Sequence, residues 1–235
     1  LALAEIAQRL KRSISEIFRV IIVMERRQWL RKDPESSRFA LTYRMLALAH
    51  HGTPAQTLTL AATPVMKALS LSSRQACHLV VRSGHQGLVI QRQESIGRAS
   101  GFAVRLGVMV DLITSCSGHV LLAFTEASAL DEVLASIPRP WGLTEKKLMA
   151  RLGRVRRQGY DLQPSPLTGG VTDISYPIRD FDGTVVAALT IPYLRFLDDP
   201  VSSAVEVSRR HLETAANQVS RSLGFNEGNL SRNRG

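Results

Sequence analysis

Residues 2–41 read ALAEIAQRLKRSISEIFRVIIVMERRQWLRKDPESSRFAL, and their pattern decides the fold of the first part of the chain. Apolar residues at helical spacing in 2–10 predict one amphipathic helix, and a second apolar stripe of the same spacing begins at Ile14. The polar residues 11–13 separate the two stripes. Two short helices around a brief break predict a helix-turn-helix, although any helical hairpin would give the same pattern.

A β-hairpin is predicted directly behind the second helix. Residues 29–32 and 38–41 are strand-like, and the turn-forming sequence DPESS lies between them. A hairpin in this place makes a wing, so we predict a winged helix-turn-helix over residues 1–41. In such a module the second helix enters the major groove of DNA and the wing lies along the phosphate backbone. The candidate DNA contacts are Ser13, Ser15, Glu16, Arg19, Arg31, Lys32 and Arg38.

The second predicted helix carries the residues that would read bases. Arg19 can pair bidentately with guanine, and Glu16 can accept a hydrogen bond from the amino group of cytosine. Ser13 stands at the helix start, where it can serve as an N-cap alone. Glu16 can instead hold Arg12 or Arg19 in place.

The net charge of +10 points toward a polyanion, but its distribution weakens that argument. Residues 1–50 carry +5, residues 51–160 carry +7 and residues 161–235 carry −2. The basic excess is therefore spread over two segments, and charge alone leaves nucleic-acid binding at even odds.

Other bulk features exclude several classes. No apolar run reaches the ~18 residues that a membrane span needs, so we expect no membrane partner. The two cysteines fit a reducing cytoplasm, and no CxxC or HExxH pattern predicts a metal site or cofactor. The chain begins with Leu1 rather than Met, and we expect its start to be clipped.

The remaining chain predicts a linker helix over 42–56, a larger domain over 57–224 and a flexible tail over 225–235. Helices interleaved with an antiparallel-type sheet imply an α+β domain with room for a small-molecule pocket. The predicted strands are 77–81, 87–91, 102–106, 172–178 and 184–191. The predicted helices are one around 60–69, one at 120–124 behind the loop 115–118, and two more over 145–158 and 201–223.

Three stretches together resemble the IclR family of bacterial transcription regulators. They are residues 2–42, the segment SCSGHVLLAF at 115–124, and RRQGYDLQPSPLTGGVTDISYPIRDFDGTVVAALTI at 156–191. The resemblance covers nearly the whole chain, but the first stretch lacks the family's leading helix. It implies a GAF-like effector-binding domain, dimers formed largely through the DNA-binding domains, tetramers in many members, and palindromic operators. Effectors in the family are commonly small carboxylates.

The resemblance also assigns site residues. Ser15 and Arg19 match the family's recognition helix, in which Glu16 replaces the usual Thr. The implied effector-binding residues are Phe102, Val110, Cys116, Ser117, Gln163, Val171, Asp173 and Thr190. The backbone N–H groups of Cys116 and Ser117 would receive a ligand oxygen at a helix start.

Three positions depart from the family pattern. Gln163 stands where Asp is typical, Asp173 where Cys is typical and Pro192 where Ser is common. A buried Asp173 would repel an anion unless it were protonated or paired, and would favour hydroxyl or amino donors. It can equally be a strand-end Asp that is bonded to backbone.

Our leading hypothesis is a DNA-binding regulator controlled by a small organic or aromatic acid, which shifts the population of DNA-competent dimers. One alternative is a regulator whose vestigial pocket serves only oligomerisation. A second is a small-molecule binder or enzyme with Cys116 as a reactive thiol, since a helix N-terminus can lower a thiol pKa. We predict no enzyme, because we expect His119 to face outward with no acidic partner. His78 alternates with apolar strand residues and is predicted to be packed.

Overall fold

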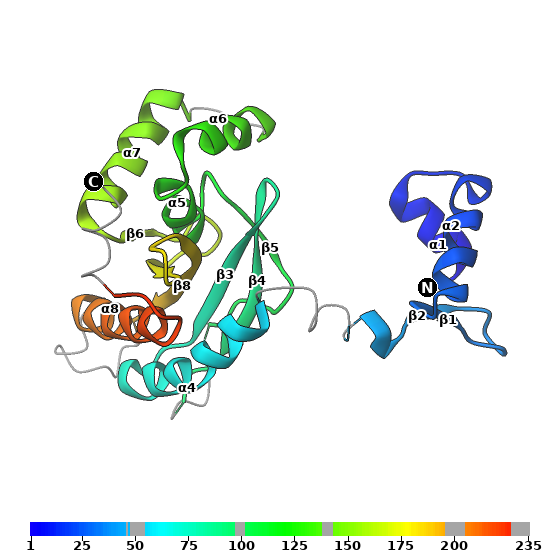
Figure 1. The fold of residues 1–235 in the computed structure, drawn as a ribbon, viewed down its shortest axis with the longest axis horizontal. Coiled ribbons are helices and arrows are strands. Elements are labelled where there is room, and N and C mark those ends of the chain that lie inside the picture. Colours follow the sequence, from blue (N-terminus) through cyan, green and yellow to red (C-terminus); the bar gives the residue numbers. More distant parts are fainter. Residues whose placement is uncertain (46, 48–54, 97–101, 138–142, 196–204, 227–235) are drawn as a thin grey trace. The chain divides into compact units, whose positions relative to one another are not determined.

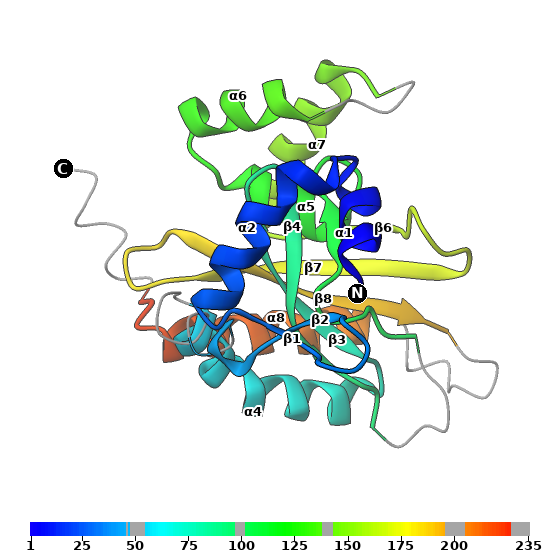
Figure 2. The same cartoon turned by 90° about the vertical axis from the view of Figure 1, so that its right-hand side faces the viewer.

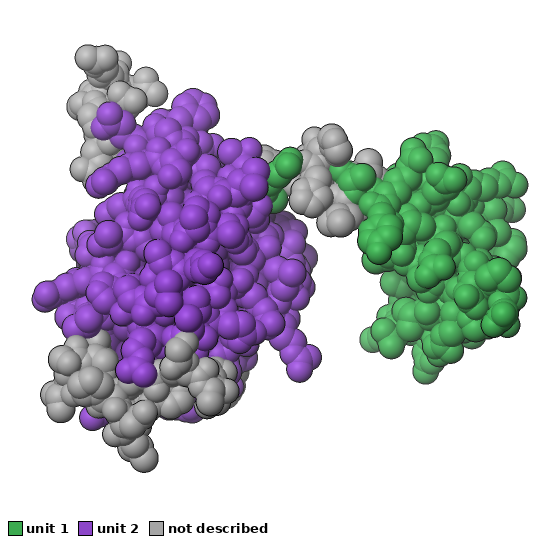
Figure 3. Space-filling view, turned by 90° about the horizontal axis from the view of Figure 1, so that it is seen from below, with its two compact units in different colours: residues 1–56 green, residues 57–235 purple. Residues whose placement is uncertain are grey.

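The computed structural model describes the chain except for residues 46, 48–54, 97–101, 138–142, 196–204 and 227–235. It divides into two compact units, residues 1–56 and 57–235 (Figure 3). Among the residues that the structure describes, no helix is both long and apolar enough to cross a membrane.

Unit 1 contains two helices and a hairpin in the predicted order (Figure 1). These elements are α1 (Leu3–Leu10), α2 (Ile14–Arg26), β1 (Leu30–Lys32) and β2 (Phe39–Leu41), with the two strands antiparallel. Helix α1 ends at Lys11, whose φ of 52° is left-handed and turns the chain toward α2. A small core of Ala7, Ile17, Ile21 and Leu30 joins the helices to the hairpin.

The predicted linker is described only in part. Residues 43–45 are helical, and Ala55 begins the long helix α4. Residues 46 and 48–54 of the predicted 42–56 linker helix lie outside the described residues, as do residues 227–235 of the predicted tail.

Unit 2 is an α+β domain built on a six-stranded antiparallel sheet in the order β5-β4-β3-β8-β7-β6. Its strands are β3 (Cys77–Ser83), β4 (Gln86–Gln93), β5 (Met109–Asp111), β6 (Asp161–Pro164), β7 (Val171–Arg179) and β8 (Val185–Leu194). Its helices are α4 (Ala55–Ser73), α5 (Cys116–Ala123), α6 (Ala127–Ser136), α7 (Glu145–Gln158) and α8 (Val205–Ser222). Figure 2 shows α4 and α8 on one side of the sheet, and α5, α6 and α7 on the other.

Side-chain alternation divides the sheet residues between the two faces. Leu79, Ile174 and Leu189 pack with α4 and α8 in one core. Val80 follows Leu79 and Ala188 precedes Leu189 in the chain. Both pack with α5, α6 and α7 in a second core. The face toward α5 therefore receives every second residue of β3, β7 and β8, and this face holds the polar residues described below.

Two expectations for unit 2 were wrong in detail. Residues 102–106 form no strand. The chain turns at Gly107, whose φ is 78°, and regular strand pairing with β4 begins at Met109. The backbone N–H of Gly107 and the carbonyl of Val108 both bond to Val89, and β5 follows at Met109–Asp111. Cys116 belongs to the first turn of α5 rather than to a preceding loop, since Ser115 caps that helix.

Candidate functional site

The start of α2 is closed by a reciprocal capping box. The hydroxyl of Ser13 accepts from the backbone N–H of Glu16 at 3.3 Å, and Oε2 of Glu16 accepts from the backbone N–H and the hydroxyl of Ser13 at 2.7 Å each. Oε1 of Glu16 also accepts from Arg12 at 3.4 Å. The Ser13 hydrogen bonds hold the pKa of Glu16 below its ordinary value. Glu16 therefore contacts Ser13 and Arg12.

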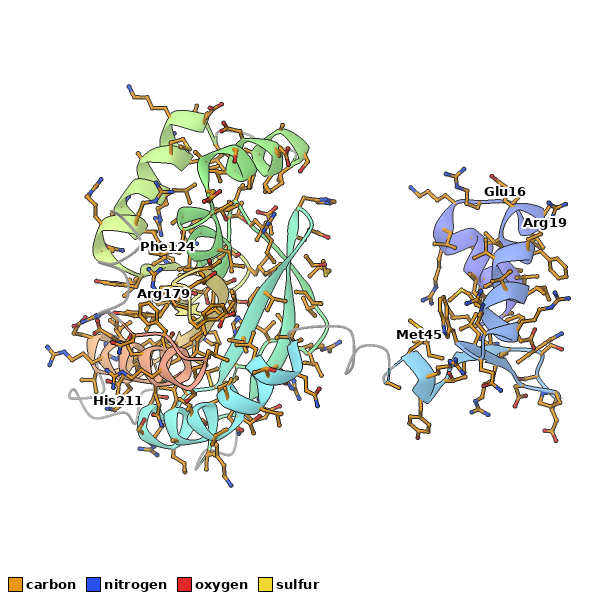
Figure 4. All side chains as sticks on the ribbon, viewed as in Figure 1. Glu16, Arg19, Met45, Phe124, Arg179 and His211 are labelled. Carbon is orange, nitrogen blue, oxygen red and sulfur yellow. The ribbon has the colours of Figure 1, made fainter. Side chains whose placement is uncertain are left out.

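The other predicted DNA contacts lie on exposed surfaces of unit 1. Ser15 and Arg19 are exposed on α2, and Figure 4 shows Arg19 near the same end of that helix as Glu16. Arg31 and Lys32 are exposed on β1. Arg38 differs, because its Nη2 donates to both carboxylate oxygens of Glu5 in α1 at 2.9 Å.

In unit 2, the first turn of α5 lies against β7. The thiol of Cys116 donates to the backbone carbonyl of Asp173 at 3.4 Å, and both Cys116 and Ser117 are buried. A Cβ at Gly118 would lie 2.3 Å from the carbonyl oxygen of Leu112, so only glycine permits this approach of the helix. The glycine of the SCSGHVLLAF segment thereby lets the start of α5 pack directly on the backbone of Leu112, just after β5.

Beneath α5, directly paired residues form a line of polar side chains across four strands, which we call the polar row. It comprises His78 on β3, Thr190 on β8, Ser175 on β7 and Asp161 on β6. All four are buried, and the hydroxyls of Ser175 and Thr190 are hydrogen-bonded at 2.8 Å. The neighbouring line on the same face pairs Pro192, Asp173 and Gln163.

The Asp161 end of the polar row is fully bonded. Nδ1 of His119 lies 2.8 Å from Oδ2 of Asp161, and Nε2 of His119 lies 2.9 Å from the carbonyl of Ile113. Both ring nitrogens of His119 therefore face oxygen acceptors, the carboxylate of Asp161 and the carbonyl of Ile113. Burial opposes ionisation of Asp161, but the hydrogen bond from His119 and the charges of His119 and Arg151 lower the pKa of this carboxyl. The expectation that His119 faces outward without an acidic partner was wrong.

Arg151 of α7 links this network to a predicted effector residue. Its guanidinium lies 2.9 Å from Oδ1 of Asp161 and donates to the side-chain carbonyl of Gln163 at 2.8 Å. The Gln163 amide donates in turn to the carbonyl of Thr114 at 2.8 Å. These residues border a cavity of about 520 Å³, lined by Ile113, Thr114, His119, Leu143, Lys147, Leu148, Ala150, Arg151, Arg154 and Gln163.

Sequence reasoning missed the roles of Asp161 and Arg151. Asp161 is the first residue of a four-residue strand that the hydrophobic pattern did not reveal, and it lies 42 positions from His119. Arg151 is one of many basic residues in α7. The only available signal was that the basic helix α7 is followed by Asp161, which suggests an ion pair between the two.

The remaining predicted effector residues do not all lie on neighbouring strands. Val171 and Thr190 are buried, and Asp173 is half-buried, with burial as the main cause that raises the pKa of its carboxyl. Val110 lies on β5, which is separated from β7 by three strands in the sheet order. Phe102 is half-buried outside any strand.

The thiol chemistry does not support the alternative of a reactive Cys116. Burial and then the charges of Asp161 and Asp173 raise the pKa of this thiol, whereas that alternative relied on a helix N-terminus that lowers it. Burial also raises the pKa of Cys77 to about 12. Both thiols are free. In the described part of the chain, no cluster of His, Cys, Asp and Glu is placed to hold a metal ion.

These features define a two-unit protein that joins a small helical unit with a hairpin to an α+β domain with a buried polar face. The family model for the bacterial transcriptional regulator IclR C-terminal domain matches residues 51–221. The chain belongs to the IclR family of bacterial transcriptional regulators.

Similar proteins agree over most of the chain. The HTH-type transcriptional regulator KdgR of Dickeya chrysanthemi is 26% identical over 235 residues, which cover 97% of this chain and 75% of that protein. The HTH-type transcriptional regulator XynR of Escherichia coli is 24% identical over 96% of this chain and 90% of its own length.

Solved structures show the same fold. A crystal structure of a putative IclR transcriptional regulator from Silicibacter has a TM-score of 0.81 at 19% identity, covering 96% of this chain and 90% of that one. An IclR homologue from Microbacterium hydrocarbonoxydans, crystallised in complex with 4-hydroxybenzoate, has a TM-score of 0.75 at 27% identity. That match covers 94% of this chain and 90% of the homologue.

Proposed function

We propose that unit 1 is a winged helix-turn-helix that binds double-stranded operator DNA, and that unit 2 is a GAF-like domain that binds a small organic acid. Binding of the acid would change the population of chains that can bind DNA. The proposal rests on two observations, the buried polar row beneath α5 in unit 2 and, in unit 1, an exposed helix that bears Ser15 and Arg19. The protein would act in the cytoplasm as a regulator without catalytic turnover.

In the DNA-binding unit we assign base reading to Arg19 rather than to Glu16. Arg19 is exposed on α2 and has no ion-pair partner among the described residues. Glu16 would have to leave its capping box with Ser13 before it could accept from a base. Arg31 and Lys32 are placed on β1 to contact phosphates, whereas Arg38 chiefly ties the hairpin to α1 through Glu5.

In the effector-binding unit we place the ligand at the first turn of α5. The backbone N–H groups of Cys116 and Ser117 would receive a carboxylate oxygen, as helix N-termini do for anions. Asp173 and Thr190 lie on the same face and would contact the polar remainder of the ligand. The complex of the Microbacterium homologue with 4-hydroxybenzoate supports an aromatic or related small acid. The raised pKa of Cys116 disfavours the thiolate, which is the form that acts as a nucleophile.

We further propose that the chain forms a homodimer or homotetramer on a palindromic operator. Family membership supports self-association, and unit 1 exposes the large apolar side chains Leu10, Val20 and Leu41, which line one groove. Exposed apolar groups that lie together are typical of surfaces that bind another protein. Two-fold symmetry of the protein would match two DNA half-sites.

The assignment of Arg19 is tested with operator DNA selected from a random-sequence pool. We expect Arg19→Ala to weaken binding by roughly 1–3 kcal/mol at fixed salt and to relax the sequence preference at one position in each half-site. Arg31→Ala should instead weaken all sequences alike and lower the salt dependence by about one released ion. Arg210→Ala on α8 is the matched control. Unchanged affinity and preference for Arg19→Ala would exclude base reading by this residue.

A further inference from the structure

The two ends of the polar row differ in how well their hydrogen bonds are satisfied. Asp161 at one end contacts both His119 and Arg151. At the other end, Nδ1 of His78 is buried and has no hydrogen-bond partner among the described residues. A buried polar atom without a partner costs free energy, and native structures keep few of them. The His78 end is therefore where the row could accept a further group.

The side chain of His78 faces the same side of the sheet as α5. Its neighbours Cys77 and Leu79 pack in the core with α4, and the Cys77 thiol lies 3.7 Å from the carbonyl of Met66 in that helix. Alternation directs His78 to the opposite face. There it is paired directly with Thr190, one of the predicted effector residues.

The pair next to His78 also has hydrogen-bonding capacity left. The bond between the Ser175 and Thr190 hydroxyls uses one of their two protons. In the described part of the chain, the other proton has no acceptor. On the far side of His78, the row reaches Arg92 of β4, whose guanidinium pairs with Glu94 at 2.7 Å. A group bound beside His78 would thus meet a donor from the hydroxyl pair and an imidazole nitrogen.

The electrostatic character of this end favours a neutral group. Burial lowers the pKa of His78 to about 4, so its ring is neutral at pH 7. Burial also raises the pKa of Asp173 in the neighbouring line. A carboxylate placed here would lack an unpaired cation, since Arg151 is paired with Asp161 and Arg92 with Glu94. A hydroxyl group both donates and accepts a hydrogen bond and carries no charge, so it fits.

We propose that His78 is an effector-contacting residue that hydrogen-bonds a hydroxyl group of the ligand and so selects hydroxylated carboxylic acids over their deoxy counterparts. The inference rests on the proposed effector site, in which the carboxylate is held at the first turn of α5. His78 then determines the specificity for the other end of the ligand. It joins Thr190 and Asp173 as the polar part of the site.

The test uses isothermal titration of the full chain with two pairs of acids, 4-hydroxybenzoate against benzoate and D-gluconate against hexanoate. We expect the wild type to prefer the hydroxylated member of at least one pair. His78→Leu should weaken that member about tenfold and leave the deoxy acid unchanged, which corresponds to about 1.4 kcal/mol. His78→Asn, which keeps a polar atom near the Nδ1 position, should retain part of the preference. His85→Leu, at an exposed turn, is the control.

The possible outcomes separate the two proposals. If His78→Leu keeps the full preference for the hydroxylated acid, the role of His78 is wrong while the effector site stands. If none of the four acids binds the wild type, the proposed class of effector is wrong and the inference fails with it. The melting temperature of unliganded His78→Leu should not fall below that of the wild type, because an unpartnered polar atom is removed. His78→Met gives the same reading if the leucine variant does not fold.

Discussion

Each unit contains a network of charged side chains, and the two networks differ chiefly in burial. In unit 1, the side chains of Glu5 and Arg38 are 42% and 52% exposed, and Glu16 pairs with Arg12 one helical turn away. In unit 2, Asp161 is only 2% exposed and pairs with His119, 42 residues distant. Exposed pairs contribute little to stability, whereas breaking a buried pair leaves a charge that water cannot solvate.

This difference matches the chemistry that each unit is proposed to perform. A surface that binds DNA must exchange its ion pairs for phosphates, and exposed arginines can do so at small cost. A buried pocket must hold its shape while a ligand enters. The Asp161 network joins α5, α7 and β6. Its charges therefore serve chiefly to hold the start of α5 in position.

The comparison is tested most severely by Asp161→Asn. This change removes the negative charge that the buried His119 ring and the half-buried Arg151 guanidinium contact. We expect the free energy of unfolding of unit 2 to fall by about 3–5 kcal/mol in urea titrations. Asp131→Asn on the exposed face of α6 should leave it unchanged. A loss no larger than that of the control would show that the buried network contributes nothing.

A second prediction concerns the pH dependence of unit 2. His78 has an ordinary pKa of 6.5 and a folded pKa of about 4 because of burial, so the unfolded chain binds its proton more readily. The free energy of unfolding is therefore unaffected by this proton above pH 6.5, and it decreases as the pH falls from 6.5 toward 4. We expect the wild type to lose on the order of 3 kcal/mol more than His78→Leu between pH 7 and pH 4.

Urea titrations at several pH values give this difference directly. The raised pKa of Asp173 acts in the opposite direction, but it is common to both proteins and cancels in the comparison. The lowered pKa of Asp161 begins to reduce stability as the pH approaches the ordinary aspartate value of 3.8, and it is likewise common to both proteins. Parallel pH profiles for the two proteins would mean that His78 is solvated in the folded state.

The secondary structure that the sequence could predict depends on contacts between residues close together in the chain. The break between α1 and α2, the Ser13 cap and the end of α7 depend on residues within one turn, and all were predicted correctly. The long strands β7 and β8 also followed from their apolar pattern.

The predictions failed where a residue's environment depends on distant segments. His119 was expected to face solvent, because nothing near it in sequence indicates that β6 brings Asp161 to its ring. The alternative of a reactive Cys116 considered the helix N-terminus alone, whereas burial is the largest influence on its pKa and raises it. The polar row itself depends on strand register across β3, β8, β7 and β6, which hydrophobic periodicity does not encode.

The smallest predicted effect concerns the local network of unit 1. Ser13→Ala removes the hydroxyl that caps α2, and we expect the free energy of unfolding of unit 1 to fall by about 1 kcal/mol. Ser13→Asn should restore most of this loss, since Asn caps helices as well as Ser does. Trp29 fluorescence reports on unit 1 when Trp141 is replaced by Phe.

The same two variants separate the cap of Ser13 from a contact with DNA. If Ser13 acts only as a cap, Ser13→Asn should bind the selected operator as the wild type does, and Ser13→Ala should bind it more weakly because the start of α2 frays. Equal losses of affinity in both variants would show that the hydroxyl itself contacts DNA. Unit 1 would then use one residue for stability and for recognition, a combination that the buried row of unit 2 divides between Asp161 and His78.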